Sequence, residues 1–88
     1  MRTDEIRGHA YTIEDTAFRS WAAFELIAVV SDDKQTPFDR AGSMFKLVEL
    51  VTNLKKADVI EIAGGESASV DDVLGVLAEI IAKIAPKN

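Results

Sequence analysis

The chain has 88 residues, of which 48% are hydrophobic and 28% charged, with a formal net charge of −5 and no cysteine. These values are typical of one folded domain spanning residues 1–88, and they exclude a disordered chain, disulfide bonds and thiolate metal sites. The acidic balance argues against binding to nucleic acid or anionic membrane surfaces, and no apolar run approaches the roughly 18 residues of a membrane-spanning helix.

The first recognisable pattern lies near the N-terminus. Apolar residues Ile6, Tyr11 and Ile13 flank Gly8 and His9, and glycine accepts the positive φ that a tight turn requires. The pattern predicts a possible short β-hairpin with His9 in its turn. The polar residues that open the chain lack the apolar stretch of a secretory signal, so we expect a cytoplasmic protein.

Residues 17–30 predict the first helix, whose apolar side chains surround most of its circumference. A helix of this kind must be covered on more than one side. Two interpretations stay open, because the helix could be the centre of the core or part of its surface could be an interface. In the second case Trp21 and Phe24 are the expected partner-binding anchors, since aromatic side chains dominate interface energetics. In the first case Trp21 is simply a core residue.

A polar loop leads to the second predicted helix, at residues 37–54. Thr36 is its expected N-cap, followed by a proline at the first helical position, where proline is favoured. Apolar residues recur at spacings of three and four, which indicates an amphipathic packing helix. Its stripe consists of Phe38, Ala41, Phe45, Val48, Val51 and Leu54, widened by Met44, Leu47 and Leu50.

Residues 55–63 would suit a strand or a helix. The following Gly64 and Gly65 favour a helix, because glycine commonly ends one. Ser69 and Asp72 then form a capping signature before the last predicted helix, at residues 70–85.

The last helix has apolar residues on more than one side. Its expected buried stripe consists of Val70, Val73, Leu74, Leu77, Ile81 and Ile84. Val76 and Ile80 lie off that stripe, and we predict that they belong to a partner-binding surface. A domain of this size buries only about 60% of the surface of its unfolded chain. The apolar surplus therefore predicts binding to another chain or self-association.

The predicted fold is mainly α, a small bundle of three to four helices with the hairpin at its N-terminus. We find no catalytic, cofactor-binding or metal-binding residues. His9 has no second histidine or cysteine to share a metal with, and acidic pairs such as Asp32 and Asp33 are chain neighbours that point apart, whereas acid–base catalysis needs facing carboxyls. We therefore expect a protein that is not an enzyme.

One resemblance is to acyl carrier proteins, small acidic four-helix proteins that carry phosphopantetheine on the serine of an Asp-Ser-Leu triplet. The stretches PFDRAG, VEL and IEI are similar to that family. The corresponding Ser43 has no preceding aspartate, however, and the predicted helix start at Pro37 would place it in the middle of a helix. Another small helical adaptor is a further alternative.

The chain more closely resembles the tail assembly chaperones of long-tailed bacteriophages, over nearly its whole length. The resemblance rests on the order and spacing of four segments rather than on any single one. These are FRSWAAFELIAVV (18–30), FKLVELVTNL (45–54), AGGESAS (63–69) and VLGVLAEIIAKIAPKN (73–88).

The resemblance implies a protein that binds the tape-measure protein, keeps it soluble and helps to recruit tail tube protein. It further implies a homo-oligomer that works in the host cell cytoplasm and is absent from the mature virion. Such chaperones are made in a short form and a frameshifted longer form. If the Pro86 codon ends in A and the Lys87 codon is AAA, the message contains a slippery run, and this chain would be the short form. An ordinary polar C-terminus is the alternative.

Overall fold

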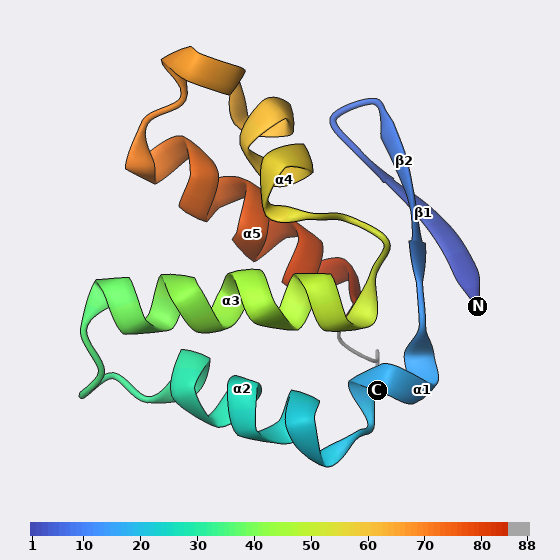
Figure 1. The fold of residues 1–88 in the computed structure, drawn as a ribbon, viewed down its shortest axis with the longest axis vertical. Coiled ribbons are helices and arrows are strands. Elements are labelled where there is room, and N and C mark those ends of the chain that lie inside the picture. Colours follow the sequence, from blue (N-terminus) through green and yellow to red (C-terminus); the bar gives the residue numbers. More distant parts are fainter. Residues whose placement is uncertain (85–88) are drawn as a thin grey trace.

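The structure is a computed structural model, and it describes residues 1–84. The segment 86–88, to which the frameshift hypothesis applies, lies outside these residues. The chain begins with an antiparallel hairpin of β1 (Arg2–Ile6) and β2 (His9–Ile13) (Figure 1). Arg7 and Gly8 form the turn, with φ values of 48° and 84°, and positive φ at both positions is typical of a type I′ turn. The hairpin is confirmed, but His9 opens β2 instead of lying in the turn.

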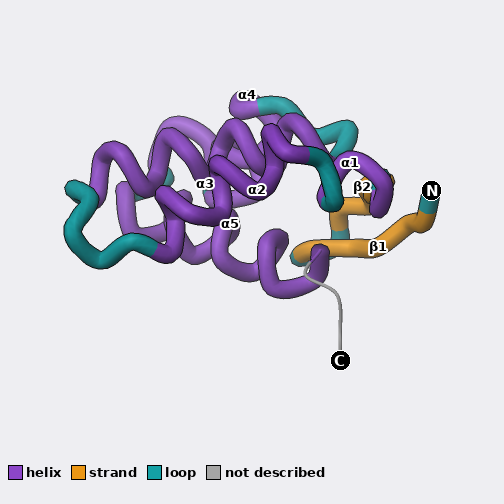
Figure 2. The backbone as a smooth tube through the Cα atoms, turned by 90° about the horizontal axis from the view of Figure 1, so that it is seen from below, coloured by secondary structure: helices purple, strands orange, loops and turns teal. Residues whose placement is uncertain are grey.

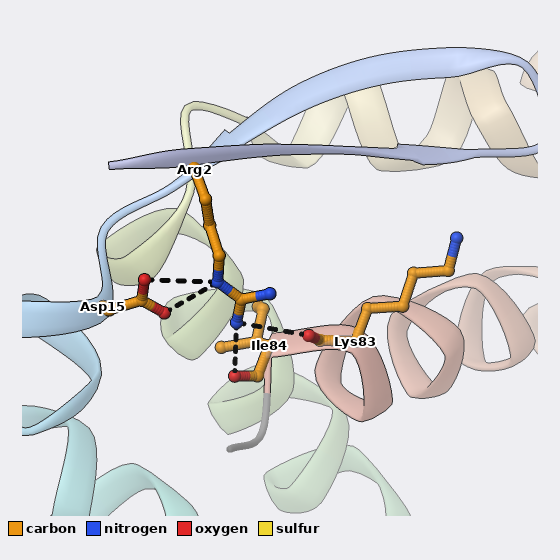
Figure 3. Close-up of polar contacts among 4 residues, drawn as sticks. All are labelled: Arg2, Asp15, Lys83 and Ile84. Atoms are coloured by element: carbon orange, nitrogen blue, oxygen red, sulfur yellow. Dashed lines mark hydrogen bonds and ion pairs between the residues drawn. The ribbon is translucent and has the colours of Figure 1, made fainter. Parts of the chain in front are cut away.

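Arg2 attaches the start of the hairpin to two helices, α1 (Asp15–Phe18) and α5 (Val70–Ile84). Its Nε lies 2.9 Å from Oδ1 of Asp15, and its Nη2 donates to the carbonyl oxygens of Ile84 at 3.1 Å and Lys83 at 3.4 Å (Figure 3). The inward face of the hairpin carries Ile6, Tyr11 and Ile13, all fully buried.

The first predicted helix is two helices, α1 and α2 (Trp21–Ser31). The break lies at Ser20, whose hydroxyl donates to the carbonyl oxygen of Ala17 at 2.6 Å and accepts from the backbone N–H of Ala23 at 3.1 Å. Serine competes with the backbone for hydrogen bonds in this way and favours helix caps over helix interiors. Ser20 therefore starts a new helix at Trp21.

The second predicted helix is α3 (Pro37–Val51). Its N-cap is confirmed, because Oγ1 of Thr36 accepts from the backbone N–H of Asp39 at 3.1 Å. The helix ends earlier than predicted because the hydroxyl of Thr52 donates to the carbonyl oxygen of Val48 at 2.6 Å and accepts from the N–H of Leu54 at 3.0 Å.

In the C-terminal half of α3 the predicted buried face is confirmed, because Leu47, Val48 and Val51 are buried. Phe38 is an exception, because its side chain is 88% exposed although we expected it in the stripe. It stands at the first turn of α3, beyond the reach of the core.

The C-terminal third contains α4 (Lys56–Ala63), the short 3₁₀ turn η1 (Gly65–Ser67) and α5. The helix predicted at 55–63 is confirmed, and Gly64 ends it with a φ of 130°. The predicted cap of α5 is also present. The N–H of Asp72 donates to Oγ of Ser69 at 3.1 Å, while Oδ2 of Asp72 accepts from the N–H of Ser69 at 3.0 Å. The hydrogen bond from the Ser69 N–H, together with a smaller contribution from the Ser69 side chain, lowers the pKa of the Asp72 carboxyl.

The helices pack in the spatial order α2, α3, α5, α4, with α3 between α2 and α5 (Figure 1). In the view from below, α2 lies in front of α3 and α5, and the hairpin lies at one end of the molecule (Figure 2). Within the described residues there are five α-helices, more than the three to four predicted, because the first predicted helix is split. The mainly α fold class with an N-terminal hairpin is confirmed.

Candidate protein-binding surface

Helix α2 has an apolar face that no other element of the described chain covers. Its sequence, WAAFELIAVVS, contains a single charged residue, Glu25. Ala23 is fully buried on the side that packs on α3. Five exposed residues before the last position of the helix lie on the other side, and we call this set the α2 outer face: Trp21, Ala22, Phe24, Glu25 and Ala28.

Two aromatic side chains dominate the α2 outer face. Trp21 is 71% exposed and Phe24 is 60% exposed. Their ring centroids are 5.3 Å apart with an interplanar angle of 23°, so the rings are stacked. A stacked pair is worth about 0.5–1.5 kcal/mol beyond its buried area. The two rings therefore form one continuous apolar projection at the surface.

The interpretation of the first helix as the centre of the core is wrong. The central helix is α3, whereas α2 is an outer helix, and Trp21 is at the surface. The prediction that Trp21 and Phe24 bind a partner stays a prediction, and their exposure makes both side chains accessible to one.

The other two predicted interface residues, Val76 and Ile80, are both fully buried. Helix α5 carries apolar residues on most of its circumference, and it is packed between α3, α4 and β1. These neighbours bury the side centred on Val76, Leu77, Ile80 and Ile84, while Val70 at the helix start is 72% exposed. The predicted stripe was therefore rotated away from the true one, and Val76 and Ile80 are core residues.

A second apolar surface is a shallow groove between α3, α4 and α5. It consists of two hollows of about 290 and 260 Å³ that share Ala41 and Leu74. We call the whole the α3–α5 groove. The first hollow is lined by Ala41, Phe45, Lys56, Ile60, Ala68, Ser69, Val70, Val73 and Leu74. The second is lined by Pro37, Arg40, Ala41, Met44, Leu74 and Ala78.

The sequence analysis missed this groove. Its residues come from α3, α4, α5 and the segment before α5, and several of them, such as Phe45, Val73 and Leu74, were expected in the packing stripes of their helices. Three small side chains line the hollows, Ala41 of α3, Ala78 of α5 and Ala68 of the segment before α5, and they leave space that larger side chains would fill. Alanine is also the best helix former, so its presence in a helical stretch gave no signal of a gap.

A third hollow, of about 220 Å³, lies beside the hairpin and is lined by His9, Ala10, Asn53, Leu54, Asp58, Glu61 and Ile62. Within residues 1–84, no group of three or more His, Cys, Asp or Glu side chains is arranged to hold a metal ion. Over the same residues, no helix is long and apolar enough to cross a membrane.

Ser43, the residue that would carry the arm in an acyl carrier protein, lies in the middle of α3 and is half-buried. A carrier serine opens its helix, so this position departs from the carrier pattern. Comparison with family models, with curated proteins and with solved structures finds no match to this chain.

Proposed function

We propose that this protein is a tail assembly chaperone of a long-tailed bacteriophage, without catalytic activity. In this role it binds the tape-measure protein, keeps it soluble and helps to recruit tail tube subunits. The observation that carries the proposal is the stacked pair of Trp21 and Phe24, exposed on the α2 outer face. Exposed apolar patches of this kind mark interaction sites on soluble proteins.

The energetics favour an apolar, helical client. Each aromatic side chain buries about 150–250 Å² when fully covered. Covering the exposed parts of both rings would therefore remove about 250 Å² from water, or roughly 6 kcal/mol before the costs of association. A client helix offers apolar side chains at spacings of three and four residues, which suit a helical binding face. The net charge of −5 would help to keep such a complex soluble.

The finer assignment rests on the resemblance of the four segments described above. In that role the protein would act in the host cell cytoplasm, would self-associate and would be absent from the mature virion. The gene order tests this assignment independently of any protein. A tail tube gene upstream and a very long tape-measure gene downstream would support it, whereas genes of a different pathway would contradict it.

Binding is tested by co-expression with the tape-measure protein of the same phage. We expect the wild-type protein to keep the tape-measure protein soluble and to co-purify with it. The double variant Trp21→Ala/Phe24→Ala should lose both properties. Phe38→Ala is the matched control, because Phe38 is an exposed aromatic residue outside α2. Unchanged co-purification by the double variant would refute the role of this face.

A further inference from the structure

The charged residues of the α3–α5 groove differ in sign from the protein as a whole. Among all residues that line the two hollows, only Lys56 and Arg40 are charged, and both are cations, although the chain carries a net charge of −5. Nζ of Lys56 lies 5.4 Å from the centroid of the Phe45 ring. Nε of Arg40 donates to the carbonyl oxygen of Val30 at 3.1 Å. The α3–α5 groove is thus apolar, with the positive charges of Lys56 and Arg40 at its edge.

The α2 outer face has the complementary character. It is apolar, it projects from the surface, and the only charged residue of α2 is the acidic Glu25, which directly follows Phe24 in the sequence. The groove in turn is concave, and its small residues leave it unfilled. Apolar shape and charge sign therefore match between these two surfaces.

We propose that the α2 outer face of one copy of this protein binds in the α3–α5 groove of a second copy. Trp21 and Phe24 would enter the hollows over Ala41 and Leu74, and Glu25 would face Lys56 and Arg40. The groove is lined by residues of α3, α4, α5 and the segment before α5, and it includes none from α2. The two partners therefore contribute different surfaces to the contact, which is head-to-tail.

A head-to-tail contact leaves one face and one groove free on every dimer. Association then continues to a closed ring or an open chain. The two hollows are small compared with a standard interface of about 1,600 Å², so we expect weak, concentration-dependent association. Self-association uses the same α2 outer face as the proposed client binding. It does not depend on that binding, and a client would compete with it.

The test alters one surface at a time and measures self-association by analytical ultracentrifugation over a range of protein concentrations. Ala41→Leu fills the region common to both hollows with a strong helix former, and it should weaken self-association about tenfold or more. Ala82→Leu, at an exposed position of α5 that does not line the groove, is the matched control and should associate as the wild type does. Circular dichroism and thermal unfolding check that both variants are folded.

Complementation then tests the head-to-tail arrangement. Trp21→Ala/Phe24→Ala keeps an intact groove, and Ala41→Leu keeps an intact face. Each should be monomeric alone, and a mixture of the two should form dimers and nothing larger. If Ala41→Leu self-associates like the wild type, the groove is not the binding site and the inference is refuted. A mixture that stays monomeric would refute it as well.

Charge reversal at two exposed residues gives a second measurement. Glu25→Lys and Lys56→Glu should each weaken association, and the double reversal in one chain should restore part of it. Equal loss in the single and double variants would contradict the pairing. The proposed function is tested separately, since Ala41→Leu should still bind the tape-measure protein. Loss of self-association in Ala41→Leu with retained client binding would support both proposals, whereas failure of the wild-type protein to bind the tape-measure protein would refute only the chaperone role.

Discussion

At the scale of single residues, the two parts of the Tyr11 side chain have opposite effects on the stability of the fold: its ring stabilises it and its hydroxyl destabilises it. Its side chain is 1% exposed, and no group among residues 1–84 hydrogen bonds to its hydroxyl. Burial raises the pKa of this hydroxyl above its usual value of 10.0; the negative charge of Asp4 raises it further, and the positive charge of Arg2 lowers it. A buried polar group without a partner costs stability. The ring therefore stabilises the core, whereas the hydroxyl opposes it.

Tyr11→Phe should accordingly not destabilise the protein at neutral pH. We expect its free energy of unfolding at pH 7 to equal that of the wild type or to exceed it by about 1 kcal/mol. At alkaline pH the stability advantage of the variant over the wild type should increase, because Tyr11 ionises at a lower pH in the unfolded wild-type chain than in the folded one. The wild type thus loses stability as the pH rises from about 10 through the folded-state pKa. Urea unfolding at both pH values measures the difference.

The control for this substitution is Tyr11→Ala, which removes the ring and should cost about 3–5 kcal/mol. A loss of more than about 1 kcal/mol in Tyr11→Phe at pH 7 would mean that the hydroxyl has a hydrogen-bond partner in solution. Tyr11 is the only tyrosine in the chain. The alkaline difference between the wild type and Tyr11→Phe therefore reports on this residue alone.

At the scale of elements, the sequence predicted where helices are capped better than it predicted which face of each helix is buried. The caps at Thr36, Ser69 and Gly64 are present because a cap depends on hydrogen bonds between residues a few positions apart. The face that a helix buries depends on its neighbours. Helix α5 is apolar on most sides, so its own sequence could not specify that α3, α4 and β1 would bury Val76 and Ile80.

The break between α1 and α2 was unpredictable for a related reason. A serine inside an apolar helical stretch can point to solvent or can cap a new helix, and both outcomes are compatible with the same local sequence. The break changes the direction of the chain, so that α2 packs along α3 and the aromatic pair lies outside the core. The exposure of Trp21 and Phe24 thus depends on tertiary packing, which their spacing in the sequence does not reveal.

Ser20→Ala should weaken the start of α2. The substitution removes the hydroxyl that caps the N–H of Ala23 and that also donates to Ala17. We expect a loss of about 1 kcal/mol in the free energy of unfolding, the usual cost of removing an N-cap. Ser31→Ala, at the exposed last position of the same helix, should change stability by less than about 0.5 kcal/mol. Equal effects in chemical unfolding would show that the cap at Ser20 is not stabilising.

At the scale of the whole molecule, the hairpin connects the two ends of the described chain. Arg2 bonds to Asp15 and to carbonyl oxygens at the end of α5, and Nζ of Lys83 donates to the carbonyl oxygen of Glu5 (Figure 3). The last carbonyl groups of a helix carry partial negative charge, which a nearby cation stabilises. Arg2 is therefore placed to hold the hairpin against both α1 and α5, so that Ile6, Tyr11 and Ile13 stay covered.

Arg2→Ala tests this attachment. The ion pair with Asp15 is half exposed and should contribute little by itself, but the hydrogen bonds to the end of α5 are lost with it. We expect a total cost of about 1 kcal/mol, with faster amide hydrogen exchange in β1 and β2 and unchanged exchange in α2. The comparison is Glu79→Gln, which removes only an exposed pair with Arg7 and should cost less than about 0.5 kcal/mol. If Arg2→Ala costs no more than Glu79→Gln and leaves hairpin exchange unchanged, the buried face of the hairpin alone holds it in place.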